Sequence, residues 1–310
     1  MDAGGPVLVL NGDAEPRHEV LAARTPDLDV GHAVPPAGIV RELSNGGLPL
    51  PEVITEDVTL HCEVDGDGEP VTVVAHGLTN NCRELAALTP MMPGTKVRFD
   101  FRGHGRSSAP PTGYRFEDLA GDVDAVATAY GATRAIGTSL GAGAIANLVT
   151  RDPHRFERMV WLLPAALDLP FGFKDRFQEL AASLDGKTPE EALEAIVSDP
   201  ERVAQYVQTP WKLDIDKVMW QHEHPDGLAR AIREVIEDWP VPDRDLLRKV
   251  TAPTLLICIE GDDIHPAELG RILHDHLPSS ELLMFESEIA LFQAIPYLVQ
   301  RVGAFLTGND

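Results

Sequence analysis

Ser139 lies in a sequence pattern that favours nucleophilic catalysis. Residues 137–141 read Gly-Thr-Ser-Leu-Gly and stand between a strand predicted over 134–136 and a helix predicted over 141–149. A serine in this setting sits on a sharp turn at the carboxyl end of a sheet, where the flanking glycines avoid a clash. Such a short pattern also arises by chance, so neighbouring segments must decide whether a reaction is encoded.

Two segments upstream of the serine give the pattern its context. Residues 75–80 read Ala-His-Gly-Leu-Thr-Asn, and residues 100–107 read Asp-Phe-Arg-Gly-His-Gly-Arg-Ser. With the serine segment, they follow the order and approximate spacing of the α/β-hydrolase fold family, which the chain resembles from about Val53 onward. The resemblance implies an oxyanion hole in which the backbone N–H groups of Leu140 and of a residue at or near Leu78 stabilise charge on a carbonyl oxygen.

The same segments and a later helical stretch carry candidate substrate-binding side chains. These are polar or aromatic residues, types that orient a small molecule in a cleft. The aromatic residues of the helical stretch also suit a structural role, in which they pack a small core of their own. The candidates are His76, Asn80, Asn81, Trp211, Trp220 and His222.

The resemblance also locates an acidic residue. Residues 253–266 read Pro-Thr-Leu-Leu-Ile-Cys-Ile-Glu-Gly-Asp-Asp-Ile-His-Pro, an apolar strand followed by a segment of the type Asp-x-x-x-Pro. The family places its triad acid at this point. The resemblance therefore implies that Asp262 is the acid, with Asp263 as the alternative register.

A histidine base is missing at the position that the family uses. The resemblance implies a histidine after a strand over 281–285, seven residues before Pro296, where this chain has Ile289. None of the residues after that strand is a histidine. His265 is close to Asp262 in sequence, but family members with a histidine there commonly keep their base elsewhere, so the sequence does not assign it that role.

Glu288 is our candidate for the vacant role. It flanks the empty position together with Glu286, and a carboxyl enclosed near Asp262 would suit general acid–base chemistry. In the alternative, both glutamates face solvent, because charged side chains on loops are mostly exposed. Ser139 then lacks a local base, and it donates a hydrogen bond or takes no part in a reaction.

These residues predict an α/β-hydrolase-fold enzyme that acts on a carbonyl-bearing small metabolite, such as an ester, a thioester or a lactone. The expected reaction is hydrolysis or acyl transfer through Ser139, with Asp262 and Glu288 completing an atypical triad. Loss of the histidine from a serine triad costs on the order of a million-fold in rate. Two alternatives therefore stay open, a lyase or cyclase that reuses the pocket, and a ligand-binding protein without catalysis.

The elements that position these residues alternate between strands and helices. Such alternation predicts a doubly wound, mainly parallel α/β sheet that is covered on both faces. We expect this core over 53–166 and 249–310.

Two further regions depart from the alternation. Residues 167–248 contain helical segments without a convincing strand, and we expect a helical lid there that covers Ser139. Residues 1–52 are rich in Pro, Gly and Asp after a short apolar run at 7–10. We expect an N-terminal extension, and the pattern leaves open whether the apolar run joins the sheet.

The composition limits the partners of the protein. The chain has 26 Lys+Arg against 49 Asp+Glu, a formal net charge of −23, which argues against nucleic-acid and anionic-membrane surfaces. Its first residues lack the features of a signal peptide, so we expect a cytoplasmic location. Three scattered cysteines indicate neither a disulfide framework nor a zinc site. We expect a small-molecule substrate, no cofactor and no metal, and leave a homodimer open.

Overall fold

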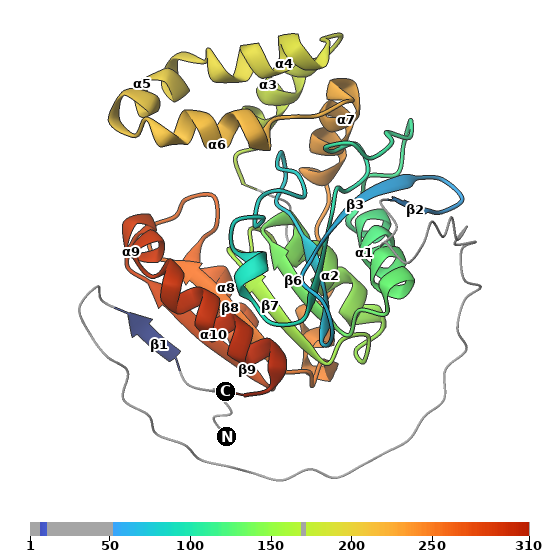
Figure 1. Cartoon of the computed structure of the whole chain (residues 1–310), viewed down its shortest axis with the longest axis vertical. Coiled ribbons are helices and arrows are strands. Elements are labelled where there is room, and N and C mark those ends of the chain that lie inside the picture. Colours follow the sequence, from blue (N-terminus) through green and yellow to red (C-terminus); the bar gives the residue numbers. More distant parts are fainter. Residues whose placement is uncertain (1–6, 11–51, 169–171, 310) are drawn as a thin grey trace.

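A nine-stranded sheet forms the centre of the computed structural model, which describes residues 7–10, 52–168 and 172–309. The strand order is β1-β9-β8-β7-β6-β4-β5-β3-β2 (Figure 1). The strands are β1 Val7–Leu10, β2 Glu52–Ile54, β3 Thr59–Asp65, β4 Val71–Ala75, β5 Thr95–Phe99, β6 Arg134–Thr138, β7 Arg158–Leu162, β8 Thr254–Ile259 and β9 Ser280–Phe285.

The sheet is mainly parallel. Every pairing from β1 across to β5 is parallel, whereas β3 and β2 continue the sheet in antiparallel fashion. The central strands β4, β6 and β8 are buried over almost their whole length, as expected for strands covered on both faces. These findings confirm the predicted doubly wound α/β sheet.

The parallel register brings the ends of three strands to one edge of the sheet. Ala75 pairs with Gly137, Thr138 pairs with Leu162, and Leu162 pairs with Ile257. The segments that follow β4, β6 and β8 therefore leave the sheet side by side. These segments carry the predicted oxyanion, serine and acid residues.

Helices cover both faces of the sheet. Alternate residues of a strand point to opposite faces, and the buried apolar residues divide accordingly, with Val73 in one cluster and Val74 in the other. The first cluster includes α1 Phe116–Tyr130, α2 Leu140–Arg151 and α8 Ala267–His276, and the second includes α10 Ile295–Thr307. Shorter elements are η1 Thr89–Met91, η2 Arg244–Lys249 and α9 Glu288–Gln293.

Five α-helices are described between β7 and β8, in the interval where the sequence predicts a helical lid. Four of them, α3 to α6, stand beyond the edge of the sheet at the top of Figure 1. Local signals explain where they begin: at α4, for example, Thr188 and Glu191 form a capping box around Pro189. The helices are α3 Lys174–Leu184, α4 Pro189–Val197, α5 Pro200–Gln208, α6 Trp211–Met219 and α7 Pro225–Val235.

The last inserted helix, α7, joins the inserted helices to the sheet domain. Its apolar side chains Leu228, Ile232 and Val235 are fully buried and belong to the same cluster as the helices α1 and α2. It also packs along α3. The inserted helices are therefore anchored through α7 rather than by the connecting loops alone.

The apolar run near the start of the chain forms β1. It pairs in parallel with β9, with Leu8 opposite Leu283. This answers the question that the sequence left open, because the run adds an edge strand to the sheet. The remainder of the expected extension, residues 1–6 and 11–51, lies outside the described residues.

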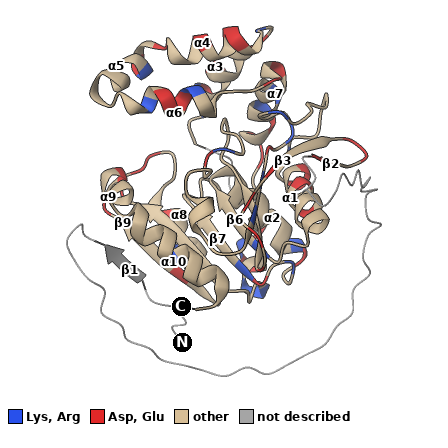
Figure 2. Ribbon diagram, in the orientation of Figure 1, with Lys and Arg blue, Asp and Glu red and all other residues tan. Residues whose placement is uncertain are grey.

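Charged residues lie around the sheet and on the inserted helices. Figure 2 shows Asp and Glu interspersed with Lys and Arg, both on the inserted helices and around the body of the molecule. Within the described ranges, no helix combines the length and apolar character needed to cross a membrane.

Candidate active site

Ser139 lies at the tip of a tight turn between β6 and α2. Its φ of 50° and ψ of −104° are rarely adopted by residues other than glycine. A Cβ on Gly137 would lie 2.5 Å from the backbone N of Ala142, and a Cβ on Gly141 would lie 2.2 Å from the backbone O of Ala75. The glycines are therefore required for the close approach of strand, turn and helix, which is the geometry expected of the Gly-x-Ser-x-Gly pattern.

A histidine and an aspartate stand in line with this serine. His265 Nε2 lies 3.1 Å from Ser139 Oγ, and His265 Nδ1 lies 2.9 Å from Asp262 Oδ2. An ionised carboxylate only accepts hydrogen bonds, so Nδ1 carries the proton and Nε2 accepts from the Ser139 hydroxyl. The side chains of His265 and Asp262 are only 19% and 22% exposed. The arrangement is that of a nucleophile, a base and an acid within hydrogen-bond reach.

Asp262 shapes the loop that carries the histidine. Its Oδ1 accepts the backbone N–H groups of Ile264 at 2.9 Å and of His265 at 3.0 Å, which turns the chain back on itself. The hydrogen bond from the His265 side chain is the main cause that lowers the pKa of Asp262 below 3.8. The acid is therefore ionised at neutral pH. Asp263, the alternative acid, is exposed.

The structure does not bring Glu288, the predicted base, to Ser139. Glu288 is the first residue of α9, its side chain is exposed, and His265 occupies the hydrogen-bonding position beside Ser139. Ser287 caps this short helix, and Ile289 in its first turn is 69% exposed. The loop after β9 therefore brings no acid–base group to the serine within the described part of the chain.

Two backbone N–H groups beside the serine suit an oxyanion. Leu140 is the first residue of α2, and the first N–H groups of a helix have no partner inside that helix. In the described ranges, the N–H groups of Leu140 and Leu78 donate to no other protein group. Both donors predicted from the sequence are thus available to a carbonyl oxygen held near Ser139.

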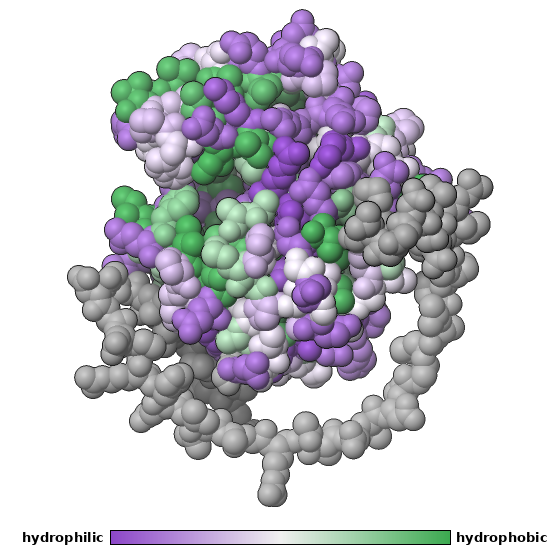
Figure 3. Space-filling view, in the orientation of Figure 1, coloured by the Kyte–Doolittle hydropathy of each residue, from purple (hydrophilic) through white to green (hydrophobic). Residues whose placement is uncertain are grey.

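A cavity of about 670 Å³ contains the serine and extends beneath the inserted helices. Figure 3 shows the hollow between these helices and the body of the molecule. Two of the predicted substrate-binding residues, Asn80 and Trp220, line this cavity. Apolar side chains from α3 and α4 complete its roof, including Phe177, Leu180 and Ile196.

His76 lies behind the cavity and has a structural role. Its Nε2 accepts the backbone N–H of Phe101 at 3.0 Å, and its Nδ1 donates to the carbonyl oxygen of Gly77 at 2.8 Å. Burial lowers the pKa of His76 to about 3, so the ring is neutral. The side chain ties the ends of β4 and β5 together, and no face of it is left for a substrate.

Asn81 and His222 connect the oxyanion segment to the inserted helices. The Asn81 amide donates to the carbonyl oxygens of Val218 at 2.8 Å and Met219 at 3.0 Å. His222 accepts the N–H of Gly105 at 2.9 Å through Nδ1, so its Nε2 carries the proton that it shares with the Thr79 carbonyl at 3.0 Å. Both residues therefore fix the position of α6 over the site.

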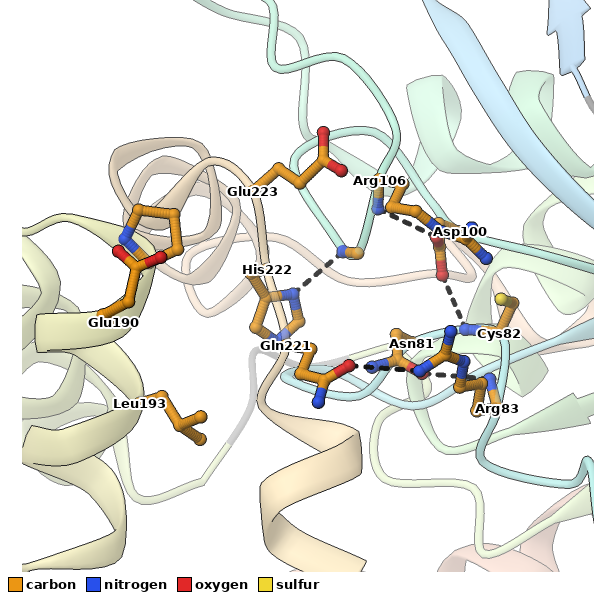
Figure 4. A pocket seen from close by; sticks show the side chains of 12 residues that line it. Asn81, Cys82, Arg83, Asp100, Arg106, Glu190, Leu193, Gln221, His222 and Glu223 are labelled. Carbon is orange, nitrogen blue, oxygen red and sulfur yellow. Dashed lines mark hydrogen bonds between the residues drawn. The ribbon is translucent and has the colours of Figure 1, made fainter.

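These two residues also line a second, smaller cavity of about 280 Å³. Figure 4 shows it between α4, which supplies Glu190 and Leu193, and the segments around Asn81 and Arg106. Ser139 is not among its lining residues, so the structure separates Asn81 and His222 from the main cavity.

Trp211 lies away from the serine, at the beginning of α6. Its side chain is 50% exposed, and its ring packs edge-on against Phe292 of α9 with centroids 5.4 Å apart. Other apolar residues of the same two regions, such as Val207 of α5 and Ile289 of α9, are also exposed. Trp211 therefore contacts α9 rather than Ser139, His265 or Asp262.

Glu84 also lies at the site, although no sequence pattern indicated it. It lines the main cavity, its Oε2 accepts the N–H of Gly77 at 2.9 Å, and its Oε1 accepts the amide of Asn80. A Cβ on Gly77 would meet Glu84 Oε1 at 3.3 Å and Ser139 Cβ at 3.5 Å, which shows how near the carboxyl is to the nucleophile. Burial raises the pKa of Glu84.

One group of side chains has the composition of a metal site. Donor atoms of His61, Glu63 and Cys82 lie within 4.8 Å of one another. Arginine side chains already pair with Glu63, with Arg98 Nη1 at 3.0 Å from its carboxylate, and burial raises the pKa of the Cys82 thiol. A cation would have to displace that guanidinium and also the proton of the thiol, so the surroundings favour the ion pair over a metal.

Comparisons with known proteins agree with this fold. A Synechocystis sp. protein with a provisional name of non-heme chloroperoxidase is 24% identical over 228 residues, which are 68% of this chain and 80% of that protein. The 2-(acetamidomethylene)succinate hydrolase of Mesorhizobium japonicum is 37% identical over 92 residues, 27% of this chain and 32% of that protein. The structure is similar to that of the enol-lactonase from Burkholderia xenovorans LB400, with a TM-score of 0.64, 22% identity, and coverage of 81% of this chain and 97% of that chain.

The family itself is shown by a match to a family model. The model of a family described as alpha/beta hydrolase fold matches residues 95–288, more than half of the chain. That range includes the serine turn, the loop after β8 and all the inserted helices. The chain therefore belongs to the α/β-hydrolase fold family of enzymes.

Proposed function

We propose that this protein is a serine hydrolase that cleaves a small ester, thioester or lactone with a triad of Ser139, His265 and Asp262. The observation that carries the proposal is the 3.1 Å contact between His265 Nε2 and Ser139 Oγ, with Asp262 on the other side of the imidazole. The triad is atypical because base and acid come from one loop.

The chemistry follows from these contacts. Ser139 Oγ attacks the carbonyl carbon while His265 takes the hydroxyl proton, and the N–H groups of Leu78 and Leu140 bind the oxyanion. Asp262 stabilises the imidazolium that forms. The imidazolium then protonates the departing alcohol or thiol, which leaves an acyl-enzyme. Water, deprotonated by His265, attacks the acyl group and restores the free serine.

The site also bears on the two alternative functions. The two alternatives are a lyase or cyclase and a ligand-binding protein, and both depend on a serine that has no base. A base in hydrogen-bond contact with the serine supports nucleophilic catalysis instead, since such a base contributes most of the rate of a serine triad. The names of two similar proteins, a hydrolase and an enol-lactonase, support hydrolytic chemistry. We also propose a cytoplasmic location.

The inserted helices are proposed to act as a lid. The main cavity is bounded by α3, α4 and α5 on one side and by Ser139 and His265 on the other. Such a cover excludes water from the acyl-enzyme until the first product has left. The hydrogen bonds from Asn81 and His222 hold the cover in register with the oxyanion segment.

The decisive experiment asks whether Ser139 is an activated nucleophile. The purified protein is treated with a fluorophosphonate probe and is assayed with 4-nitrophenyl acetate, next to Ser139→Ala. We expect the wild type to be labelled at Ser139 and to release 4-nitrophenol, and the variant to do neither. A folded wild type that is neither labelled nor active would overturn the proposal.

A further inference from the structure

Arg202 is fixed at the roof of the active-site cavity by three buried side chains. Its guanidinium carbon lies 5.0 Å from the ring centroid of Trp220, and its Nη1 donates to Asp216 Oδ2 at 2.8 Å. Tyr206 donates to the same carboxylate oxygen at 2.8 Å. Trp220, Asp216 and Tyr206 are 5%, 7% and 9% exposed. A solvent-facing arginine keeps most of its rotamer freedom, whereas this one has lost it.

The rest of this guanidinium is open to the cavity. Arg202 lines the same cavity as Ser139 and His265, and its side chain is 28% exposed. A guanidinium carries five N–H groups, and hydrogen bonds with Asp216 and Tyr206 engage only some of those of Arg202. A planar cation with unused donors therefore faces the space in which a substrate would lie.

The carboxylates around the cavity are engaged with other groups or face solvent. Asp199 accepts the backbone N–H groups of the first turn of α5, and Glu84 accepts from the oxyanion segment. Glu201 is 80% exposed and lies 4.0 Å from Arg176, and Glu179 is exposed. Neither engaged carboxylate pairs with the Arg202 guanidinium, and Asp216 occupies only one of its nitrogens.

We propose that Arg202 binds a carboxylate carried by the acyl part of the substrate, so that the preferred substrates are esters, thioesters or lactones of dicarboxylic acids. A guanidinium matches a carboxylate in shape and charge, and it loses little freedom on binding when it is already fixed. The acyl part is favoured because it stays on Ser139 through both steps of the reaction. A cavity of about 670 Å³ accommodates a chain of several carbons. This inference rests on the proposed hydrolase function.

The test compares two esters of equal acyl length. The first is the mono-4-methylumbelliferyl ester of adipic acid, and the second is 4-methylumbelliferyl hexanoate. We expect wild-type kcat/KM to be at least about tenfold higher for the adipate ester, because a charge-assisted hydrogen bond is worth roughly ten- to hundredfold. Arg202→Met should remove that preference and leave kcat/KM for the hexanoate ester within about threefold.

Two further variants separate recognition from folding. Arg176→Met alters the more exposed arginine of the same cavity and should change neither substrate by more than about threefold. Arg202→Lys keeps the charge next to Asp216 without the planar fork, and should retain only part of the preference. Fluorophosphonate labelling of Ser139 checks that each variant is folded.

The outcomes distinguish this inference from the hydrolase function. A wild type that labels at Ser139 but hydrolyses the hexanoate ester as fast as the adipate ester would overturn the carboxylate site and leave the hydrolase intact. Equal losses on both esters in Arg202→Met, with Ser139 still labelled, would reduce Arg202 to a packing residue. Absence of labelling in the wild type would reject the underlying hydrolase function itself.

Discussion

The loops that follow β8 and β9 contribute very differently to the site. The first holds both Asp262 and His265 in contact with Ser139, whereas the second begins an exposed helix with Glu288. The sequence predicts a different division, with the acid on the first loop and the base on the second. Proton transfer needs a base within about 3 Å of the hydroxyl. Of these two loops, the first places a side chain at that distance from Ser139.

Local hydrogen bonding explains how one loop supplies both groups. Asp262 uses one oxygen to bind two backbone N–H groups and the other to bind the imidazole of His265. The first interaction makes the turn, and the second orients the ring. The loop after β9 has no equivalent turn, because Ser287 starts a helix there. The contact between His265 and Ser139 therefore depends on the bend at Asp262.

Removal of the imidazole should give the largest effect on this comparison. We expect His265→Ala to lower kcat/KM by about 10⁴- to 10⁶-fold with 4-nitrophenyl acetate, because Ser139 loses its base. The matched control is Glu288→Gln on the second loop, which should stay within about twofold. If Glu288→Gln lost more activity than His265→Ala, the roles of the two loops would have to be exchanged.

Asp262→Asn should give the next largest loss, about 10²- to 10⁴-fold in kcat/KM, because the imidazolium loses its partner and the turn loses its charged acceptor. The pKa of Asp262 is lowered, so its ionised form contributes stability above about pH 3.8 that is lost as the pH falls below the lowered value. The wild-type pH–rate profile should thus show no titration of Asp262 above pH 4. The Asp263→Asn variant serves as control, and a loss of equal size there would reassign the acid.

The sheet and the serine turn could be predicted from the sequence because they depend on local patterns. Apolar strands, helical spacing and the glycines at 137 and 141 act over a few residues, and the same is true of the strand that leads to Asp262. The base could not be assigned this way. His265 is close to Asp262 in sequence, but its contact with Ser139 depends on the order of the strands. It also depends on the Asp262 side chain, which bends the loop.

The inserted helices were predictable to a similar extent. Their helical character follows from spacing and caps, whereas the burial of α7 in the main core depends on contacts with α1 and α2, which are distant in sequence. The candidate residues Asn81 and His222 were selected for polar contacts with a substrate, yet their hydrogen bonds go to backbone groups across the domain boundary. Residue type alone does not distinguish these uses.

A decrease in pH should lower the stability of the fold through buried histidines that lie outside the loop of Asp262 and His265. Burial lowers the pKa of His76, His104 and His222 to about 3 from 6.5. Between these values the unfolded chain binds protons that the native protein does not, so stability falls as the pH decreases. The loss is up to about 1.4 kcal/mol per histidine for each pH unit below 6.5. Urea unfolding at pH 7.5 and 5.5 measures it, and equal midpoints would show that these rings are not sealed from solvent.

The smallest effect is expected when the base is returned to the second loop. The double variant His265→Ala/Ile289→His places an imidazole where the family keeps it, and we expect kcat/KM within about threefold of His265→Ala alone. Ile289 is 69% exposed on the first turn of α9, so a ring at this position would point into solvent rather than to Ser139. Ile289→His in the otherwise wild-type chain controls for damage to the fold and should retain full activity. Recovery of more than about tenfold in the double variant would mean that α9 unwinds to deliver a base, and that the two loops are interchangeable in function.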